Sequence, residues 1–157
     1  MNYLTSSNKP NMKFTQITFL RAFATVANVS QPVRNYYSPD TWKKQLPILA
    51  ENKNKPGVYR WVNQVNHKSY VGASASLTNR LKHYFSSQSL TFFSLSKRER
   101  KKNRVGSDLV INRAILKHTL TNFNLEILAY CALADLAKKE RYYISKYQPE
   151  YNLNLKG

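Results

Sequence analysis

Acidic residues are scarce in this sequence: 8 aspartates and glutamates stand against 25 lysines and arginines, which gives a formal net charge of +17. Charge of one sign repels itself in isolation and attracts polyanions. We expect nucleic acid as the partner, because each phosphate that a cation neutralises releases condensed counterions. An anionic membrane surface is the weaker interpretation, since no long helix has basic residues on one side and large apolar residues on the other. The plain alternative is a basic surface that only confers solubility.

Cysteine, glycine and long apolar runs are also scarce, and each scarcity excludes a class of protein. The single cysteine, Cys131, cannot form an internal disulfide, which fits a compartment where disulfides are not used. Four glycines in the chain exclude a Gly-rich loop that cradles phosphates. No apolar run approaches the roughly 20 residues that cross a bilayer, so we expect no membrane insertion. Hydrophobic residues still make up 42% of 157 residues, enough for the core of one domain.

The first 37 residues differ in composition from the rest of the chain. No acidic residue precedes Asp40, and residues 14–29 predict an amphipathic helix. An acid-free, Arg-bearing start predicts a mitochondrial presequence, with Arg34 at the third position before a cut that precedes Tyr37. We therefore expect the protein in the mitochondrial matrix. The alternative for residues 1–37 is a basic arm that stays attached and contacts nucleic acid.

The remaining pattern predicts an α/β fold, a small antiparallel three- to four-stranded sheet flanked by three helices. Residues 38–55 predict a short helix, interrupted by Pro47, and a linker. The domain itself spans residues 56–155. Its strands are expected at 57–65, 69–73 and 122–131, its helices at 77–85, 107–119 and 133–146, and residues 151–155 are the candidate for a fourth strand.

Two tyrosines in the predicted hairpin share one side of the sheet. A turn centred on residues 66–67 pairs Asn63 with Tyr70, and strand alternation puts Tyr59 on the same side. The pattern alone is also that of an ordinary aromatic cross-strand cluster that includes Trp61.

Two charged residues lie on or beside apolar helix faces. Arg80 flanks the apolar stripe of the 77–85 helix, where it either binds an anion or extends its guanidinium into water. Glu140 lies on the apolar stripe of the 133–146 helix, formed by Leu133, Leu136, Ala137, Ile144 and Tyr147. The glutamate either pairs with Arg80 or holds a hard divalent cation, with both groups flanking a phosphodiester.

These residues fall in a series of motifs that resembles the GIY-YIG endonucleases, most closely those encoded in organellar introns. The series runs in order over about 100 residues. Its motifs are Gly57-Val58-Tyr59, Tyr70-Val71-Gly72, the arginine motif at 77–81, the third strand at 122–128, the glutamate helix at 140–144 and the asparagine motif at 149–153. Val58 and Val71 replace the isoleucines that give the family its name.

The resemblance implies metal-dependent hydrolysis of phosphodiester bonds in DNA. By similarity, Glu140 holds Mg²⁺ or Mn²⁺, Tyr59 orients or deprotonates the attacking water, and Tyr70 assists it. Arg80 stabilises the phosphate charge, and Asn152 supports the site. A tyrosine with a pKa near 10 needs nearby cations to act as a base at neutral pH, which the arginine and the metal supply. All of these groups are expected on one side of the sheet.

Two features depart from homing relatives. Tyr84 stands where those enzymes often place a histidine, and the chain ends at Gly157, so we expect no separate module for sequence specificity. A different class of function is therefore the alternative: a catalytically silent structural protein of the mitochondrial ribosome that binds rRNA and ribosomal proteins. In either case we expect nucleic-acid contacts from Arg60, Lys82, His83, Lys97, Arg98, Arg100, Lys101, Lys102 and Arg104.

Overall fold

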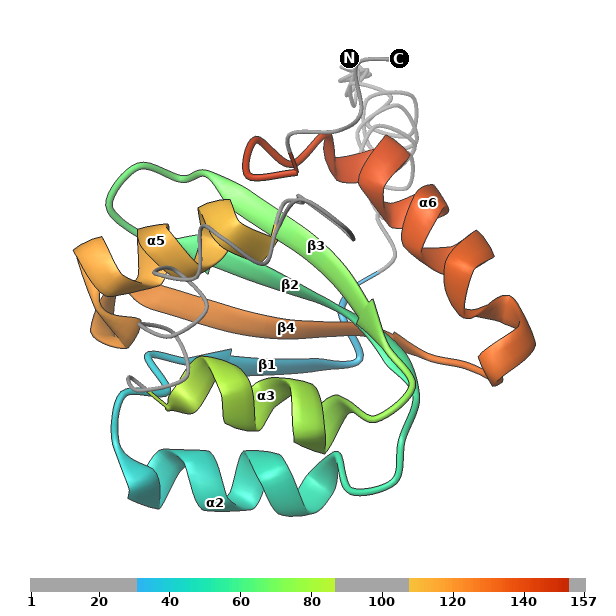
Figure 1. Ribbon diagram of the computed structural model, residues 1–157, viewed down its shortest axis with the longest axis horizontal. Helices are drawn as coiled ribbons and strands as arrows, with labels where there is room; N and C mark the ends of the chain where they lie inside the picture. The colour runs from blue at the N-terminus through green and yellow to red at the C-terminus, as the bar shows by residue number, and fades with distance from the viewer. Residues whose placement is uncertain (1–30, 87–107, 153–157) are drawn as a thin grey trace, which may run out of the picture. The chain divides into compact units, whose positions relative to one another are not determined.

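The computed structural model describes residues 31–86 and 108–152, and every element named below belongs to one unit, Pro32–Gly157. The described strands are β1 (Arg34–Tyr37), β2 (Gly57–Asn63), β3 (Ser69–Ser74) and β4 (Phe123–Tyr130). The described α-helices are α2 (Trp42–Glu51), α3 (Leu77–Phe85), α5 (Asp108–His118) and α6 (Leu136–Tyr147). The strands form one antiparallel sheet in the order β1-β4-β2-β3, which confirms the predicted fold class (Figure 1).

The fourth strand is not the one that the sequence suggested. Residues 34–37, placed in the N-terminal extension by the sequence, form β1 and pair with β4 along its outer edge. A polar network holds this short strand: Tyr36 donates a hydrogen bond to Glu51, and Asn52 donates one to the Tyr36 oxygen at 3.1 Å. Tyr130 of β4 donates to the Asn52 side chain at 3.0 Å. The network joins β1, α2 and β4 through side chains far apart in the sequence.

The β2–β3 hairpin has a register two residues from the predicted one. Trp61, and not Asn63, faces Tyr70, because the turn begins earlier than residues 66–67 suggest. Asn63 starts it: its side-chain oxygen accepts the Val65 N–H at 2.9 Å, and its main-chain N–H donates to the Lys68 carbonyl oxygen at 2.9 Å. A shift of an even number of residues leaves every side chain on its predicted face.

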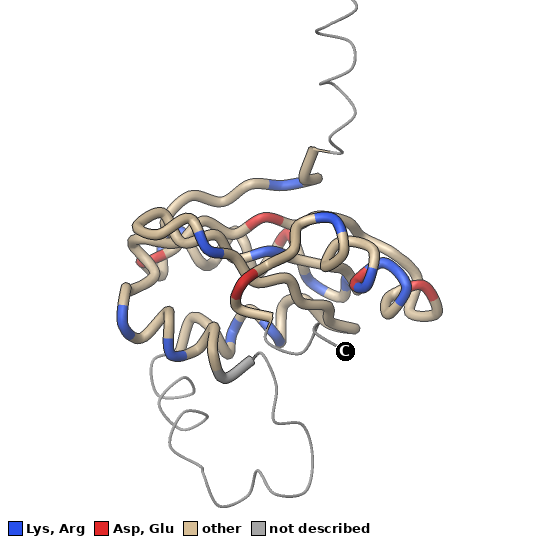
Figure 2. Tube along the Cα trace, turned by 90° about the horizontal axis from the view of Figure 1, so that it is seen from above, with Lys and Arg blue, Asp and Glu red and all other residues tan. Residues whose placement is uncertain are grey.

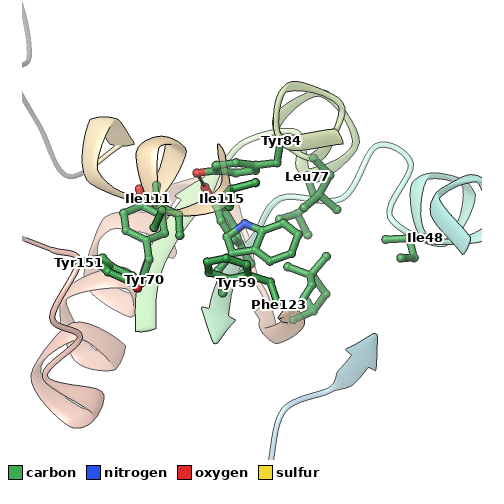
Figure 3. Close-up of a cluster of buried hydrophobic side chains, with 14 residues drawn as sticks. Ile48, Tyr59, Tyr70, Leu77, Tyr84, Ile111, Ile115, Phe123 and Tyr151 are labelled. Atoms are coloured by element: carbon green, nitrogen blue, oxygen red, sulfur yellow. Dashed lines mark hydrogen bonds between the residues drawn. The ribbon is translucent and has the colours of Figure 1, made fainter. Parts of the chain in front are cut away.

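Helices cover both faces of the sheet. One core lies on the face of Tyr59 and Tyr70, where α3 and α5 pack and α2 contributes Ile48 (Figure 3). The other core lies on the face of Val58 and Val71, where α6 packs. The alternation of β2, with odd-numbered residues towards α3 and even-numbered residues towards α6, produces these two layers.

Two helices differ in detail from their predictions. Pro47 does not interrupt α2, which continues to Glu51. The carbonyl group of Lys43, which loses its helical partner at a proline four residues on, lies in an exposed turn where water can bind it. Leu133 was expected on the buried stripe of α6 but lies in the 3-10 turn η3 (Leu133–Asp135), and 64% of its surface is exposed.

Some predictions fall on residues that the structure does not describe. They are the helix at 14–29, the basic run at 97–104, and residues 153–155 of the candidate strand. Tyr151 and Asn152 of that candidate form a turn and not a strand. In the described part of the chain, no helix combines the length and the apolar character that crossing a membrane requires.

Candidate active site

The predicted tyrosine pair is the centre of the candidate site. Tyr59 in β2 lies opposite Gly72 of β3, and Tyr70 in β3 projects from the same face. The two rings lie 6.2 Å apart between centroids, and both side chains are buried. Their common face confirms the prediction from strand alternation.

Gly72 leaves the space that the Tyr59 phenol occupies. A Cβ atom at this position would lie 2.6 Å from the Tyr59 hydroxyl oxygen and 2.8 Å from the Tyr70 ring. Such distances are shorter than packed atoms tolerate, so only glycine lets the Tyr59 phenol lie across β3. At Gly57 a Cβ atom would meet the Ala129 carbonyl oxygen at 2.5 Å, so this glycine lets β4 approach. Close packing therefore requires glycine both at Gly57 and at Gly72.

Tyr84 joins the tyrosine pair, a role that sequence reasoning missed. Its hydroxyl forms a hydrogen bond of 2.9 Å with the hydroxyl of Tyr59, inside the core (Figure 3). The sequence marked Tyr84 as a departure from homing relatives but did not indicate its contact with Tyr59. The signal that could have revealed it is the spacing from Arg80, one helical turn earlier, where homing relatives often have a histidine.

Arg80 lies in the first half of α3, the helix that follows β3 along the chain. Its side chain is partly buried beside the stripe of Leu77, Leu81 and Tyr84, as the sequence predicted. Lys82 and His83 lie on the same helix and are exposed. The helix therefore presents Lys82 and His83 to solvent.

Glu140 is partly buried on the inward side of α6, one turn before the buried Tyr143. The Tyr143 hydroxyl donates to the Leu128 carbonyl oxygen at 3.1 Å and so fixes α6 to β4. Leu128 lies where the β2–β4 register shifts, so its carbonyl group is available to a side chain.

All site residues were expected on one side of the sheet, and the elements that carry them pack on both of its faces. The tyrosines project towards α3, whereas α6 packs through Tyr143, Ile144 and Tyr147 on the opposite face. The sequence showed that Glu140 lies on the inward side of its helix, but not which face of the sheet that helix covers. Helix α6 contacts β3 and β2, and both strands also contribute side chains to the core under α3.

Asn152 binds the free edge of β3. Its side-chain oxygen accepts the Val71 N–H at 2.9 Å, and its side-chain amide donates to the Val71 carbonyl oxygen at 2.7 Å. The amide thus takes the place of a neighbouring strand. Tyr151 adds a main-chain hydrogen bond to Ser69 at 3.0 Å, and its hydroxyl bonds Asn63 at 3.1 Å. This segment positions the strand that carries Tyr70.

Arg60, predicted to contact nucleic acid, makes contacts within the protein. Its guanidinium forms two hydrogen bonds with the Glu126 carboxylate, at 2.7 and 3.1 Å, and lies 3.9 Å from the Tyr147 ring centroid. Burial raises the pKa of Tyr147, although the Arg60 guanidinium beside it favours the phenolate. The pair joins β2, β4 and α6 on the face away from the tyrosines.

The described residues offer one kind of metal site. Within residues 31–86 and 108–152, no three His, Cys, Asp or Glu side chains gather as a ligand cluster. A structural zinc site needs such a cluster. Mg²⁺ takes one or two carboxylates, with substrate phosphates and water completing its shell. The partly buried Glu140 fits that second pattern.

Comparison with known proteins agrees with these motifs. The family model of the GIY-YIG catalytic domain matches residues 55–152. The UvrABC system protein C of Clostridium tetani is 35% identical over 113 residues, 71% of this chain and 14% of that protein. The protein of the same name from Clostridium beijerinckii is 33% identical over 116 residues, 73% of this chain and 15% of that protein.

The catalytic domain of homing endonuclease I-TevI aligns with a TM-score of 0.45 and 22% identity, over 62% of this chain and 94% of that domain. The chain spans about a seventh of the length of the curated relatives it matches. The family match covers most of the chain and includes Tyr59, Tyr70, Arg80, Glu140 and Asn152. The chain therefore belongs to the GIY-YIG family.

Proposed function

We propose that this chain is a metal-dependent endonuclease domain that hydrolyses phosphodiester bonds of DNA. The observation that supports it best is the attachment of all five candidate residues to β3. Tyr70 lies in the strand, Tyr59 lies across its Gly72, and Arg80 follows on the next helix. Glu140 lies on the helix that packs against the strand, and Asn152 binds the strand edge. A nuclease site needs such groups held on one rigid element.

In this proposal Tyr59 orients the attacking water and takes its proton. The water oxygen then attacks phosphorus, and the bond to the leaving oxygen breaks. A phenol is a weak base, so its anionic form must be favoured. The hydroxyls of Tyr59 and Tyr84 share a hydrogen bond in which either can donate, and it favours the Tyr59 phenolate when Tyr84 is the donor. A guanidinium close to the oxygen would favour the phenolate as well. Tyr70 packs against Tyr59 and restricts its position.

Arg80 stabilises the negative charge of the phosphate as the new bond forms, since a guanidinium matches phosphate oxygens with several donors. Glu140 would hold Mg²⁺ or Mn²⁺, which when bound polarises the phosphate. Asn152 has a positioning role, because its hydrogen bonds to Val71 hold β3, the strand that carries Tyr70. The exposed Lys82 of α3 supplies charge for the DNA backbone, and the exposed His83 beside it can donate a hydrogen bond.

A plasmid-nicking assay tests the proposal. Purified protein with Mg²⁺ or Mn²⁺ should convert supercoiled plasmid to the nicked form, and EDTA should stop the reaction. Glu140→Ala should lower the rate by roughly a hundredfold or more, with an unchanged circular dichroism spectrum.

Asp135→Asn is the matched control, because it removes an exposed carboxylate from η3 just before α6. This variant should cleave like the wild type. Equal cleavage by Glu140→Ala and the wild type would remove the assignment of Glu140, and no metal-dependent nicking by the wild type would refute the function.

We also propose that the protein acts in the mitochondrial matrix, which the acid-free start of the sequence supports. A fluorescent reporter fused to residues 1–37 should enter mitochondria. Because residues 34–37 form β1, a cut before Tyr37 would remove most of that strand. N-terminal sequencing of the imported protein would locate the mature end, and a cytosolic reporter would refute the location.

A further inference from the structure

The outward side of α6 is basic and has no part in the site above. Lys138, Arg141, Tyr142 and Ser145 are all exposed, and their spacing of three, four and seven residues puts them on one stripe of the helix. We call these four residues the outer face of α6. Tyr142 has 56% of its surface exposed, and the ammonium group of Lys146 lies 6.0 Å from its ring centroid.

The cations of this face do not serve the fold. Among the described residues, Lys44 pairs with Asp40 and Arg60 pairs with Glu126, and neither Lys138 nor Arg141 belongs to these two ion pairs. Arg60 shows by contrast how a structural arginine is held here, between a carboxylate and an aromatic ring. Lys138 and Arg141 are therefore exposed on the helix and take part in neither of these pairs.

Their positions are also unfavourable for an isolated helix. Lys138 lies in the first turn of α6, where the positive end of the helix dipole opposes a cation; the one carboxylate at this end is that of the N-cap residue Asp135. Lys138 and Arg141 are three residues apart on one side, so their charges repel each other. Glu140, the only acid of the helix, points inward and does not offset them. An external anion would relieve both costs.

We propose that the outer face of α6 binds the phosphate backbone of DNA flanking the cleaved bond, a second contact surface besides α3. The proposal rests on the proposed endonuclease function. Because α3 and α6 pack on opposite faces of the sheet, contacts at α6 add to those of Lys82 and His83 without competing for the same space. The excess of basic over acidic positions along the described chain is visible in Figure 2.

The composition of the stripe favours DNA over a lipid surface. A helix of 12 residues is about 18 Å long, a span that covers roughly five phosphates of one strand. A membrane-binding helix instead places large apolar residues along one side of a basic face. Here the side opposite the basic stripe is already buried against the sheet, and Tyr142 is the one large hydrophobic residue of α6 that is mostly exposed.

A binding measurement separates this inference from the catalytic one. The assay follows fluorescence anisotropy of a labelled DNA duplex in EDTA, where no cleavage is expected, at NaCl concentrations from about 50 to about 200 mM. Three proteins are compared: the wild type, K138Q/R141Q on α6, and K43Q/K53Q. The last variant removes the same charge from two exposed lysines at and just beyond α2, so it controls for net charge.

Each lost phosphate contact lowers the slope of log K against log salt by about 0.9, so K138Q/R141Q should lower it by about 1.8. K43Q/K53Q should change it much less. An equal change in both variants, or no change in K138Q/R141Q, would overturn the inference. Loss of binding to phosphatidylserine vesicles by K138Q/R141Q, with duplex binding intact, would also overturn it. If the wild type nicks plasmid while any of these results is obtained, only the α6 inference fails.

Discussion

Gly72→Ala tests whether the Tyr59 phenol lies across β3 as the structure places it. The added methyl group would lie 2.6 Å from the Tyr59 hydroxyl oxygen and 2.8 Å from the rings of Tyr59 and Tyr70. Both side chains are buried, with at most 3% of their surface exposed. Replacing a strand glycine should by itself stabilise the fold by roughly 0.5–1 kcal/mol. Overpacking costs about 1–3 kcal/mol, and two fixed rings favour the upper part of that range.

We therefore expect Gly72→Ala to lower the free energy of unfolding by about 2 kcal/mol, as measured by urea denaturation. Nicking should fall further than stability explains, because Tyr59 must leave its position. The comparison with Tyr59→Phe and the double variant isolates the contact: removing the hydroxyl should make Gly72→Ala less costly, by about 0.5 kcal/mol or more. A Gly72→Ala protein as stable and as active as the wild type would refute this geometry.

Three further substitutions test other contacts. Asn152→Ala removes two hydrogen bonds to the β3 edge and should cost about 1–3 kcal/mol in urea denaturation, whereas Asn79→Ala, at an exposed position of α3, should cost less than about 0.5 kcal/mol. Arg60→Ala leaves the largely buried Glu126 carboxylate unpaired and should lower the free energy of unfolding by about 2–3 kcal/mol. If the loss in the double variant with Glu126→Ala equals the sum of the two single losses, the two residues do not stabilise each other. Burial and the neighbouring Glu51 carboxylate raise the pKa of Tyr36 above its value in the unfolded chain, which is about 10. Tyr36 therefore contributes fully to the free energy of unfolding below pH about 10, and this contribution is lost as the pH rises further. Between pH 8 and pH 11, the free energy of unfolding should fall less for Tyr36→Phe than for the wild type. Equal falls in the two proteins would show that Tyr36 does not cause the pH dependence.

The hairpin shows why the sequence predicted the faces of the side chains better than their pairing. Alternation along a strand is local, so the common face of Tyr59 and Tyr70 follows from their positions in the chain. Pairing depends on the turn, which Asn63 closes with its own side chain and main chain. The predicted register was wrong by two residues, but an even error does not change a face.

For α6, the helix of Glu140, the sequence predicted the inward side of the helix but not the face of the sheet against which it packs. The apolar stripe of α6 predicts which side of the helix is inward, and the structure confirms that Glu140 lies there. Either face of a sheet can receive such a stripe, so the sequence did not indicate that α6 lies away from the tyrosines. Packing against Val58 and Val71, together with the hydrogen bond from Tyr143 to Leu128, decides it.

By itself the sequence determined the strands β2, β3 and β4, the helices with their inward sides, and the family, because these depend on periodicity and on short motifs. The tertiary structure decided the partners: β1 at the outer edge of β4, Tyr84 on the Tyr59 hydroxyl, Asn152 on the β3 edge and Arg60 on Glu126. Each of these contacts joins residues between 25 and 93 positions apart. Such contacts depend on how the layers pack, which a local pattern does not encode.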